Sequence, residues 1–299
     1  MKLEKLVKVA LDELRMQMLG VQVLFGFQLQ GVFQDGFAQT SRNARWADAA
    51  ALSLIVLTLG LLVAVPSQHR LVDRGNATTR IFAVANRFAE WALLPFALSL
   101  ALDFFVVADR YLPTYAVAAA LSAGFAAVAF WYGLGAVLRL TVQQKEKRQM
   151  PAETATDVHA KIEEMLTEAR VILPGAQALL GFQFVVTMSK AFAQLAPGDQ
   201  HIHFAALCAV ALSVMLLITP AAVHRMTFGG EDVARFHKIG SVIVTIALIP
   251  LALGVAGDFY LAASRMVDSQ PIATGAAIVA FMILAFLWYG VPLILRRRA

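Results

Sequence analysis

Charged residues and cysteine are scarce in this chain. Only 15% of its 299 residues are charged and one is a cysteine, whereas 59% are apolar. Because soluble domains carry about 25% charged residues, the low charge excludes a disordered chain and a large soluble catalytic domain. The lone Cys208 excludes a secreted scaffold held by disulfides. The composition instead predicts an all-α protein that lies in a lipid bilayer.

Sequence motifs of common enzyme and cofactor sites are also missing. The chain has no GxxxxGK[ST], HExxH, GxSxG or CxxC segment. His201 and His203 are two residues apart, so they do not share a helical face, and no third metal ligand accompanies them. We therefore expect no enzymatic activity, no cofactor and no metal site.

Apolar runs long enough to cross a bilayer, about 20 residues each, recur along the chain. Polar turns, or turns with proline and glycine, separate these runs. The sequence predicts eight transmembrane helices, at Leu14–Ala38, Trp46–Pro66, Ile81–Ala108, Thr114–Leu138, Val171–Gln194, His203–Pro220, Ile239–Ala262 and Ile272–Leu295. The N-terminal segment mixes acids with bases and lacks the order of a signal peptide, so we expect the first run to be retained as a span.

The eight spans fall into two similar halves. Leu11–Gln39 resembles Leu166–Gln194, 155 positions later, and the similarity continues through four spans. Matching pairs include Glu13/Glu168, Arg15/Arg170, Gln22/Gln177, Gln28/Gln183, His69/His224, Pro95/Pro250 and Asp103/Asp258. Four spans are an even number, so both halves must cross the membrane in the same direction. We predict two parallel four-helix repeats.

Most Lys and Arg residues fall on one side of the predicted spans, near the chain ends, in the 66–80 and 220–238 turns and in the central linker. By the positive-inside rule, both termini are expected in the cytoplasm, with the protein in a bacterial inner membrane. Anionic lipid headgroups are the expected partner of the basic side, given the net charge of +5. No basic soluble domain remains that would bind nucleic acid.

Two polar segments precede the first spans of the repeats. Met1–Leu14 carries apolar residues on one helical face, and residues 141–168 contain a charged run followed by a helical pattern. We expect amphipathic helices at the cytoplasmic surface, with a solvated linker as the alternative for the second segment. The predicted domains are thus 1–140, 141–168 and 169–299. Assembly into a homo-oligomer stays open at this point.

One repeat resembles a known family. The segment Glu168–Gln183, EARVILPGAQALLGFQ, followed by His224 and Arg225, resembles an uncharacterised bacterial family of integral-membrane proteins, a domain of unknown function. The first repeat departs from the family pattern with Leu19 where the second has Pro174. The resemblance implies a tandem duplication of a four-helix unit that resides in a membrane. It supplies no catalytic residues.

Polar side chains within the spans are the candidates for function, because they are costly in a bilayer. The first spans of the repeats share a polar stripe, with glutamines on a second line; it comprises Arg15, Gln22, Gln28, Arg170, Gln177 and Gln183. Hydrogen bonding between helices is the favoured interpretation, and a polar permeation path is the alternative.

Acidic residues mark a second candidate site. Asp103 and Asp258 each follow a proline by eight residues, and we expect Pro95 and Pro250 to kink their helices. The candidate ion or proton cluster consists of Asp35, Asp103, Lys190 and Asp258. If Lys190 pairs with Asp35 or Asp258, a structural salt bridge is the better interpretation. Asp35 beside Asp103 would instead form a carboxylate pair.

Two short motifs recur near the expected cytoplasmic ends of the spans. His69-Arg70 and His224-Arg225 end the second span of each repeat, where we expect arginine to reach lipid headgroups; pH sensing by the histidine is the alternative. Trp131-Tyr132-Gly133 and Trp288-Tyr289-Gly290 are expected to act as aromatic anchors at the membrane interface.

The first functional hypothesis is a small channel or transporter for an ion, a proton or a solute. The alternative is a membrane protein without transport activity that acts as a scaffold or regulator through its amphipathic segments. The choice depends on whether the acids face a hydrated path or are paired and sealed.

Overall fold

The computed structural model describes residues 3–138, 155–228, 234–267, 269–291 and 293–294, in which every regular element is a helix. The helices are α1 (Leu3–Val32), η1 (Phe37–Gln39), α2 (Arg42–Leu71), α3 (Thr79–Tyr111), η2 (Pro113–Tyr115), α4 (Ala116–Val128), η3 (Ala129–Gly133), α6 (Ala155–Thr187), α7 (Lys190–Ala193), α8 (Pro197–Phe228), α9 (Ala234–Met266), α10 (Gln270–Ala285) and η4 (Phe286–Gly290). The predicted all-α fold class is confirmed.

Seven segments in the described part of the chain are long and apolar enough to cross a membrane. They are Arg42–Leu71, Thr79–Tyr111, Pro113–Leu138, Ala160–Thr187, Pro197–Thr227, Ala234–Arg265 and Gln270–Gly290. The helix α1 has 30 residues, long enough for an eighth span, but its glutamines at 17, 22, 28 and 30 lower its hydropathy. The chain is therefore a multi-pass helical membrane protein.

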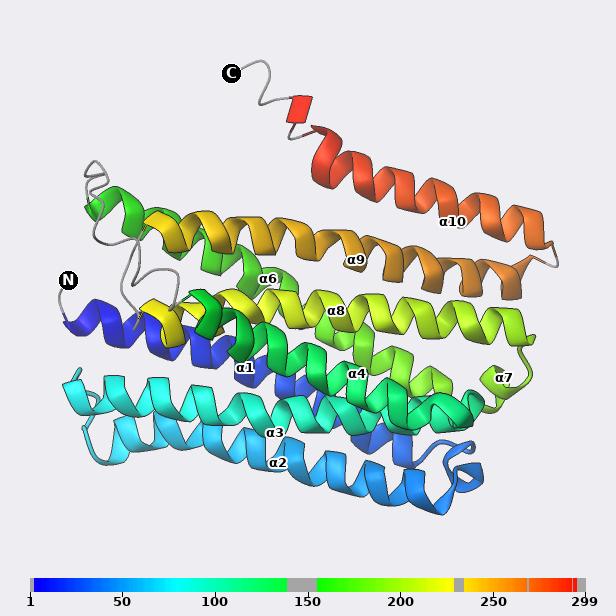
Figure 1. Cartoon of the computed structure of the whole chain (residues 1–299), viewed down its shortest axis with the longest axis horizontal. Helices are drawn as coiled ribbons and strands as arrows, with labels where there is room; N and C mark the ends of the chain where they lie inside the picture. Colours follow the sequence, from blue (N-terminus) through cyan, green and yellow to red (C-terminus); the bar gives the residue numbers. More distant parts are fainter. Residues whose placement is uncertain (1–2, 139–154, 229–233, 268, 292, 295–299) are drawn as a thin grey trace.

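The two repeats run in parallel, as predicted. Figure 1 shows α1 and α6 starting at the same end of the bundle and running in the same direction, and the two helices pack against each other. In each repeat the next three long helices then alternate in direction (Figure 1). We call the end where α1 begins the terminal end, and the end where α1 stops and α2 begins the distal end.

The first helices of the repeats include much of the two polar segments. The helix α1 begins at Leu3 and α6 at Ala155, and both continue without a break into the membrane-spanning part. The described part of the expected amphipathic segments is thus continuous with the spans, and the predicted boundary at 168 falls inside α6. Residues 141–154 of the expected linker lie outside the described residues.

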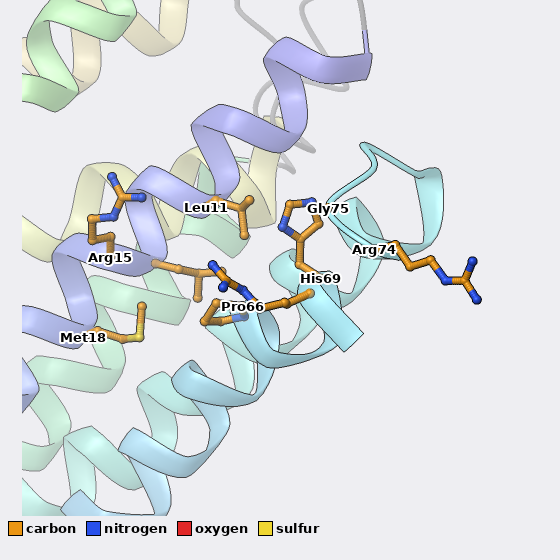
Figure 2. A pocket seen from close by; sticks show the side chains of 9 residues that line it. Leu11, Arg15, Met18, Pro66, His69, Arg74 and Gly75 are labelled. Atoms are coloured by element: carbon orange, nitrogen blue, oxygen red, sulfur yellow. The ribbon is translucent and has the colours of Figure 1, made fainter. Parts of the chain in front are cut away.

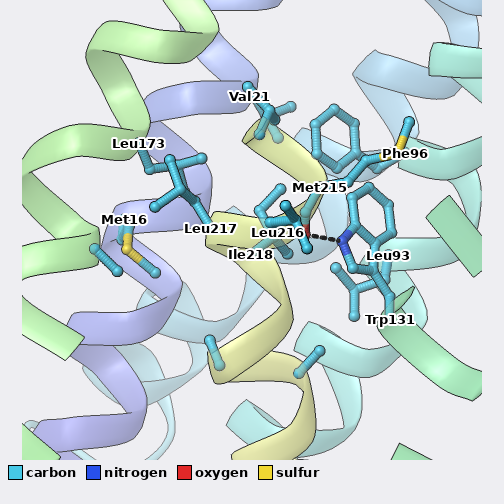
Figure 3. Packing of buried hydrophobic residues seen from close by; sticks show 14 of the residues in the cluster. Met16, Val21, Leu93, Phe96, Trp131, Leu173, Met215, Leu216, Leu217 and Ile218 are labelled. Carbon is cyan, nitrogen blue, oxygen red and sulfur yellow. Dashed lines mark hydrogen bonds between the residues drawn. The ribbon is translucent and has the colours of Figure 1, made fainter. Parts of the chain in front are cut away.

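The centre of the bundle holds Trp131, which the sequence placed at the membrane interface. Its side chain is fully buried, and its indole N–H donates to the Met215 carbonyl at 3.0 Å (Figure 3). The ring stacks on Phe96 at 5.3 Å between centroids. The expectation of an interfacial anchor is thus wrong for Trp131, because η3, which continues α4, packs against α8.

Prolines lie inside the long helices without ending them. Pro95 and Pro250 lie near the middle of α3 and α9. A tyrosine from the last helix of each repeat hydrogen bonds beside the turn that each proline interrupts. Tyr132 donates to the Glu90 carbonyl at 2.6 Å, and Tyr289 donates to the Thr245 carbonyl at 2.5 Å. The two repeats thus share a tyrosine hydrogen bond to the carbonyl five residues before the proline.

Candidate functional site

A polar cluster lies near the distal end of the first repeat, where α1, α2 and α3 meet. The Gln28 amide nitrogen donates to both carboxylate oxygens of Asp103, at 2.7 and 2.6 Å, and contacts the Ser99 hydroxyl at 3.2 Å. Ser99 in turn donates to the Ala51 carbonyl on α2 at 3.0 Å. We call Gln28, Asp48, Ser99 and Asp103 the first-repeat cluster.

The carboxylate of Asp103 is enclosed and close to a second acid. Asp103 is 8% exposed and shares a small pocket with Asp48 of α2, which acts on it electrostatically. Within the described residues, no basic side chain forms an ion pair with either acid. The side-chain amide oxygen of Gln28, Oε1, is buried and accepts no hydrogen bond from any described residue. The cluster therefore has acceptors in excess and no positive charge of its own.

The second repeat has a matching cluster on α6, α8 and α9. The Gln183 amide donates to Asp258 at 2.8 Å, and this pair is separated by 75 residues along the chain, as is Gln28–Asp103. His203 lies beside them, with its Nδ1 at 3.6 Å from Asp258 Oδ1 and its Nε2 at 3.1 Å from the Gln183 carbonyl. Thr187 contacts the same Nε2 at 3.3 Å. We call Gln183, Thr187, His203 and Asp258 the second-repeat cluster.

The two clusters differ at one equivalent position. Asp48 in the first repeat corresponds to His203 in the second, 155 positions later. A protonated histidine supplies a positive charge beside Asp258, whereas Asp48 adds a second negative charge beside Asp103. Across the described residues, no group of three His, Cys, Asp or Glu side chains is placed to hold a metal ion. The first-repeat cluster thus lacks the positive charge that its equivalent can carry.

The four residues of the candidate ion or proton cluster do not come together in one site. Lys190 pairs with Asp35 at 3.0 Å, and both side chains are more than half exposed. Asp103 and Asp258 lie instead in the two separate clusters. The exposed Asp35–Lys190 pair joins the two repeats at the surface of the distal end.

The predicted polar stripe is also divided. Arg15 and Gln22 are exposed, and Arg15 donates to Asp12 at 3.2 Å. Arg170 is half-buried, and Gln177 is fully buried in the contact between α1 and α6, where it lies against the backbone of Gly20. Gln28 donates to the buried Asp103, and Gln183 donates to the half-buried Asp258. The six residues therefore do not line a single path.

An ion cluster that the sequence did not assemble crosses the two repeats near the terminal end. Glu13 on α1 is 1% exposed and accepts from Arg225 Nε at 2.7 Å on one oxygen. Its other oxygen lies 3.2 Å from His224 Nδ1. The sequence pattern does not show that the partners of Glu13 come from the other repeat.

The comparison with protein families places both repeats in one family. The chain belongs to the family described as "Family of unknown function (DUF6328)", which matches residues 2–135 and again residues 152–292. The predicted resemblance to an uncharacterised family is confirmed, and the two matches agree with a tandem duplication. No curated protein and no solved structure matches the chain.

Proposed function

We propose that this family member moves protons across a bacterial inner membrane, with the first-repeat cluster as the site that takes up and releases them. The observation that carries the proposal is the pair of acids, Asp103 and Asp48, in one small pocket among long apolar helices, without a basic partner among the described residues. Intramembrane acids of this kind mark proton and ion pathways in membrane proteins.

The physical argument is charge neutralisation. A carboxylate in the bilayer interior is costly unless a counter-charge or hydrogen bonds compensate it. Gln28 supplies hydrogen bonds to Asp103 but no charge. A proton shared between Asp103 and Asp48 removes one of the two negative charges, because two close carboxylates cannot both ionise at low cost. In the second-repeat cluster the residue beside Asp258 is the base His203, so this cluster does not place two acids together.

The proposed orientation follows the distribution of basic residues. With the Lys- and Arg-rich terminal end in the cytoplasm, the first-repeat cluster lies near the outer side. Lipids with anionic headgroups then surround the basic terminal end. The described part of this end includes Arg15, Arg70, Arg74 and Arg235.

The test is proton flux in liposomes. Purified protein is reconstituted, a potassium gradient with valinomycin drives protons, and a trapped pH dye reports their entry. We expect flux with the wild type, loss to the level of protein-free vesicles with Asp103→Asn, and wild-type flux with Asp35→Asn. Asp35 is the matched control because it is a distal-end acid that is exposed and already paired.

Parallel measurements with Na⁺, K⁺ and Cl⁻ define the ion. Flux of Na⁺ or K⁺ that depends on Asp103, without proton flux, would replace the proton by a metal cation at the same site. Absence of every flux with folded wild-type protein would refute transport and favour the alternative, a scaffold or regulatory membrane protein.

A further inference from the structure

A His-Arg pair ends the second long helix of each repeat, and in the second repeat this pair binds a carboxylate. In the second repeat, His224 and Arg225 together hold the carboxylate of Glu13, at 3.2 and 2.7 Å. All three side chains are almost completely buried. The pair on α8 therefore acts as an anion-binding unit whose anion is supplied by the chain itself.

The equivalent pair in the first repeat, His69 and Arg70 on α2, opens onto a pocket instead. The pocket has a volume of about 690 Å³ and lies between α1 and the turn that follows α2. Its lining residues are Leu11, Leu14, Arg15, Met18, Pro66, His69, Arg70, Arg74 and Gly75, with no acid among them. Figure 2 shows His69 facing the space beside α1, with Arg15 on one side and Arg74 on the other.

The acids nearest to this pocket in the described chain are already engaged. Asp12 accepts from Arg15 at 3.2 Å. Asp73 accepts from Arg80 at 2.6 Å and from Thr78 at 2.7 Å, and these hydrogen bonds hold the pKa of Asp73 below its ordinary value. Glu168, the equivalent of Glu13, is exposed on α6. The first repeat thus has no described carboxylate in the place that Glu13 takes in the second.

The turn after α2 fixes one wall of the pocket. Arg74 and Gly75 both have positive φ values, 52° and 78°, and the Gly75 N–H donates to the His69 carbonyl at 2.9 Å. A positive φ is unfavourable for arginine, so the surrounding contacts hold this turn in place. The Nε2 of His69 is buried and makes no hydrogen bond to any described residue.

We propose that this pocket binds a phosphate group that replaces, in the first repeat, the Glu13 carboxylate of the second. Arginine side chains bind phosphate through charge-assisted and often bidentate hydrogen bonds. The apolar residues beside them, Leu11, Leu14 and Met18, lie against the membrane-spanning part of α1. Both an anionic phospholipid headgroup and free phosphate present this chemistry. The site is independent of proton movement at the distal end.

The test is binding to purified protein in detergent, followed by native mass spectrometry. The probes are phosphatidylglycerol, phosphatidylcholine and inorganic phosphate, and the variants are Arg70→Gln and His69→Gln. Arg87→Gln is the control, because Arg87 is exposed on the neighbouring helix α3 and does not line the pocket. Thermal unfolding of each variant shows that it is folded.

We expect phosphatidylglycerol to bind more tightly than phosphatidylcholine. Loss of one charge-assisted hydrogen bond in Arg70→Gln should weaken this binding roughly tenfold or more, while Arg87→Gln binds as the wild type does. Competition by inorganic phosphate would identify a soluble ligand, and no competition would identify a lipid headgroup. Equal binding of both lipids with no binding of phosphate, or equal loss in Arg70→Gln and Arg87→Gln, would overturn the proposal.

Discussion

In the second repeat, Asp258 lies beside His203 and the His224-Arg225 pair holds Glu13. In the first repeat, Asp103 lies beside another acid, and the His69-Arg70 pair lines an open pocket without acids. In the second repeat these positions thus have an ionisable partner of the opposite type within the chain, whereas in the first repeat the described residues supply none. A duplicated unit can in this way keep one copy for stability and use the second for binding.

The unequal packing of the repeats supports this division. In the most apolar stretch of α8, 83% of the residues are buried, whereas in the matching stretch of its equivalent α2 the share is 28%. The helix α8 lies in the centre because α6, α9 and η3 all pack against it. Its polar groups are therefore enclosed and must be satisfied internally, while α2 lies at the outside and can present His69 and Arg70 to a ligand.

The largest expected effect comes from exchanging the one residue that distinguishes the distal clusters. Asp48→His replaces the second acid of the first-repeat cluster by a base, so the two acids no longer share a proton and proton flux should fall to the level of protein-free vesicles. The reverse exchange, His203→Asp, should leave flux intact because Asp103 and Asp48 are untouched. Flux is measured with the trapped pH dye in liposomes. Wild-type flux in Asp48→His would contradict the assigned difference between the clusters.

The next largest effect concerns the glutamates of the two first helices. Glu13→Gln leaves Arg225 buried without its counter-charge and should destabilise the protein by about 3–5 kcal/mol. The equivalent Glu168→Gln changes an exposed residue and should alter stability by less than about 0.5 kcal/mol. Unfolding by denaturant in micelles measures both. Equal losses of stability in the two variants would show that Glu13 and Glu168 make equivalent ion pairs.

The smallest of the three effects tests the contact between α1 and α6. A Cβ at Gly181 would lie 2.1 Å from Phe27 Cδ2 and 2.8 Å from Phe27 Cβ, whereas one at the equivalent Gly26 meets nothing within 4 Å. Gly181→Ala should therefore cost about 1–3 kcal/mol. Gly26→Ala should be neutral or stabilise by up to about 1 kcal/mol through helix propensity. A stable Gly181→Ala variant would show that the repeats separate more easily than the close contact implies.

Much of the candidate site could be found from the sequence, but not its pairings. Gln28, Asp103, Gln183 and the half-buried Asp258 all stand out in the sequence, because polar residues inside apolar runs are rare. The sequence instead grouped Asp103 and Asp258 with Asp35 and Lys190, which the structure places in a separate exposed ion pair. Hydropathy identifies the apolar segments, but it does not show which helices pack against each other, and the pairing of these residues depends on that packing.

Two ionisable residues of the clusters are absent from the predicted site although the sequence carries a signal for them. No motif in the sequence marks Asp48, and the spacing of His203 from His201 indicates only a weak pattern for metal ligands. Alignment of the repeats places Asp48 at the position of His203, so an acid-for-base difference was visible. Its meaning depends on the neighbouring aspartates, which only the packing of α2 on α3 and of α8 on α9 brings close.

The scarcity of charge and the long apolar runs determined that this chain is a helical membrane protein, and its internal similarity determined two parallel repeats. Those features follow from the cost of polar groups in a bilayer and from the even number of spans. Only the tertiary structure decided which repeat satisfies its own charges. That choice arises because α8 is enclosed and α2 is not, so identical motifs meet a buried Glu13 in one case and an open pocket in the other.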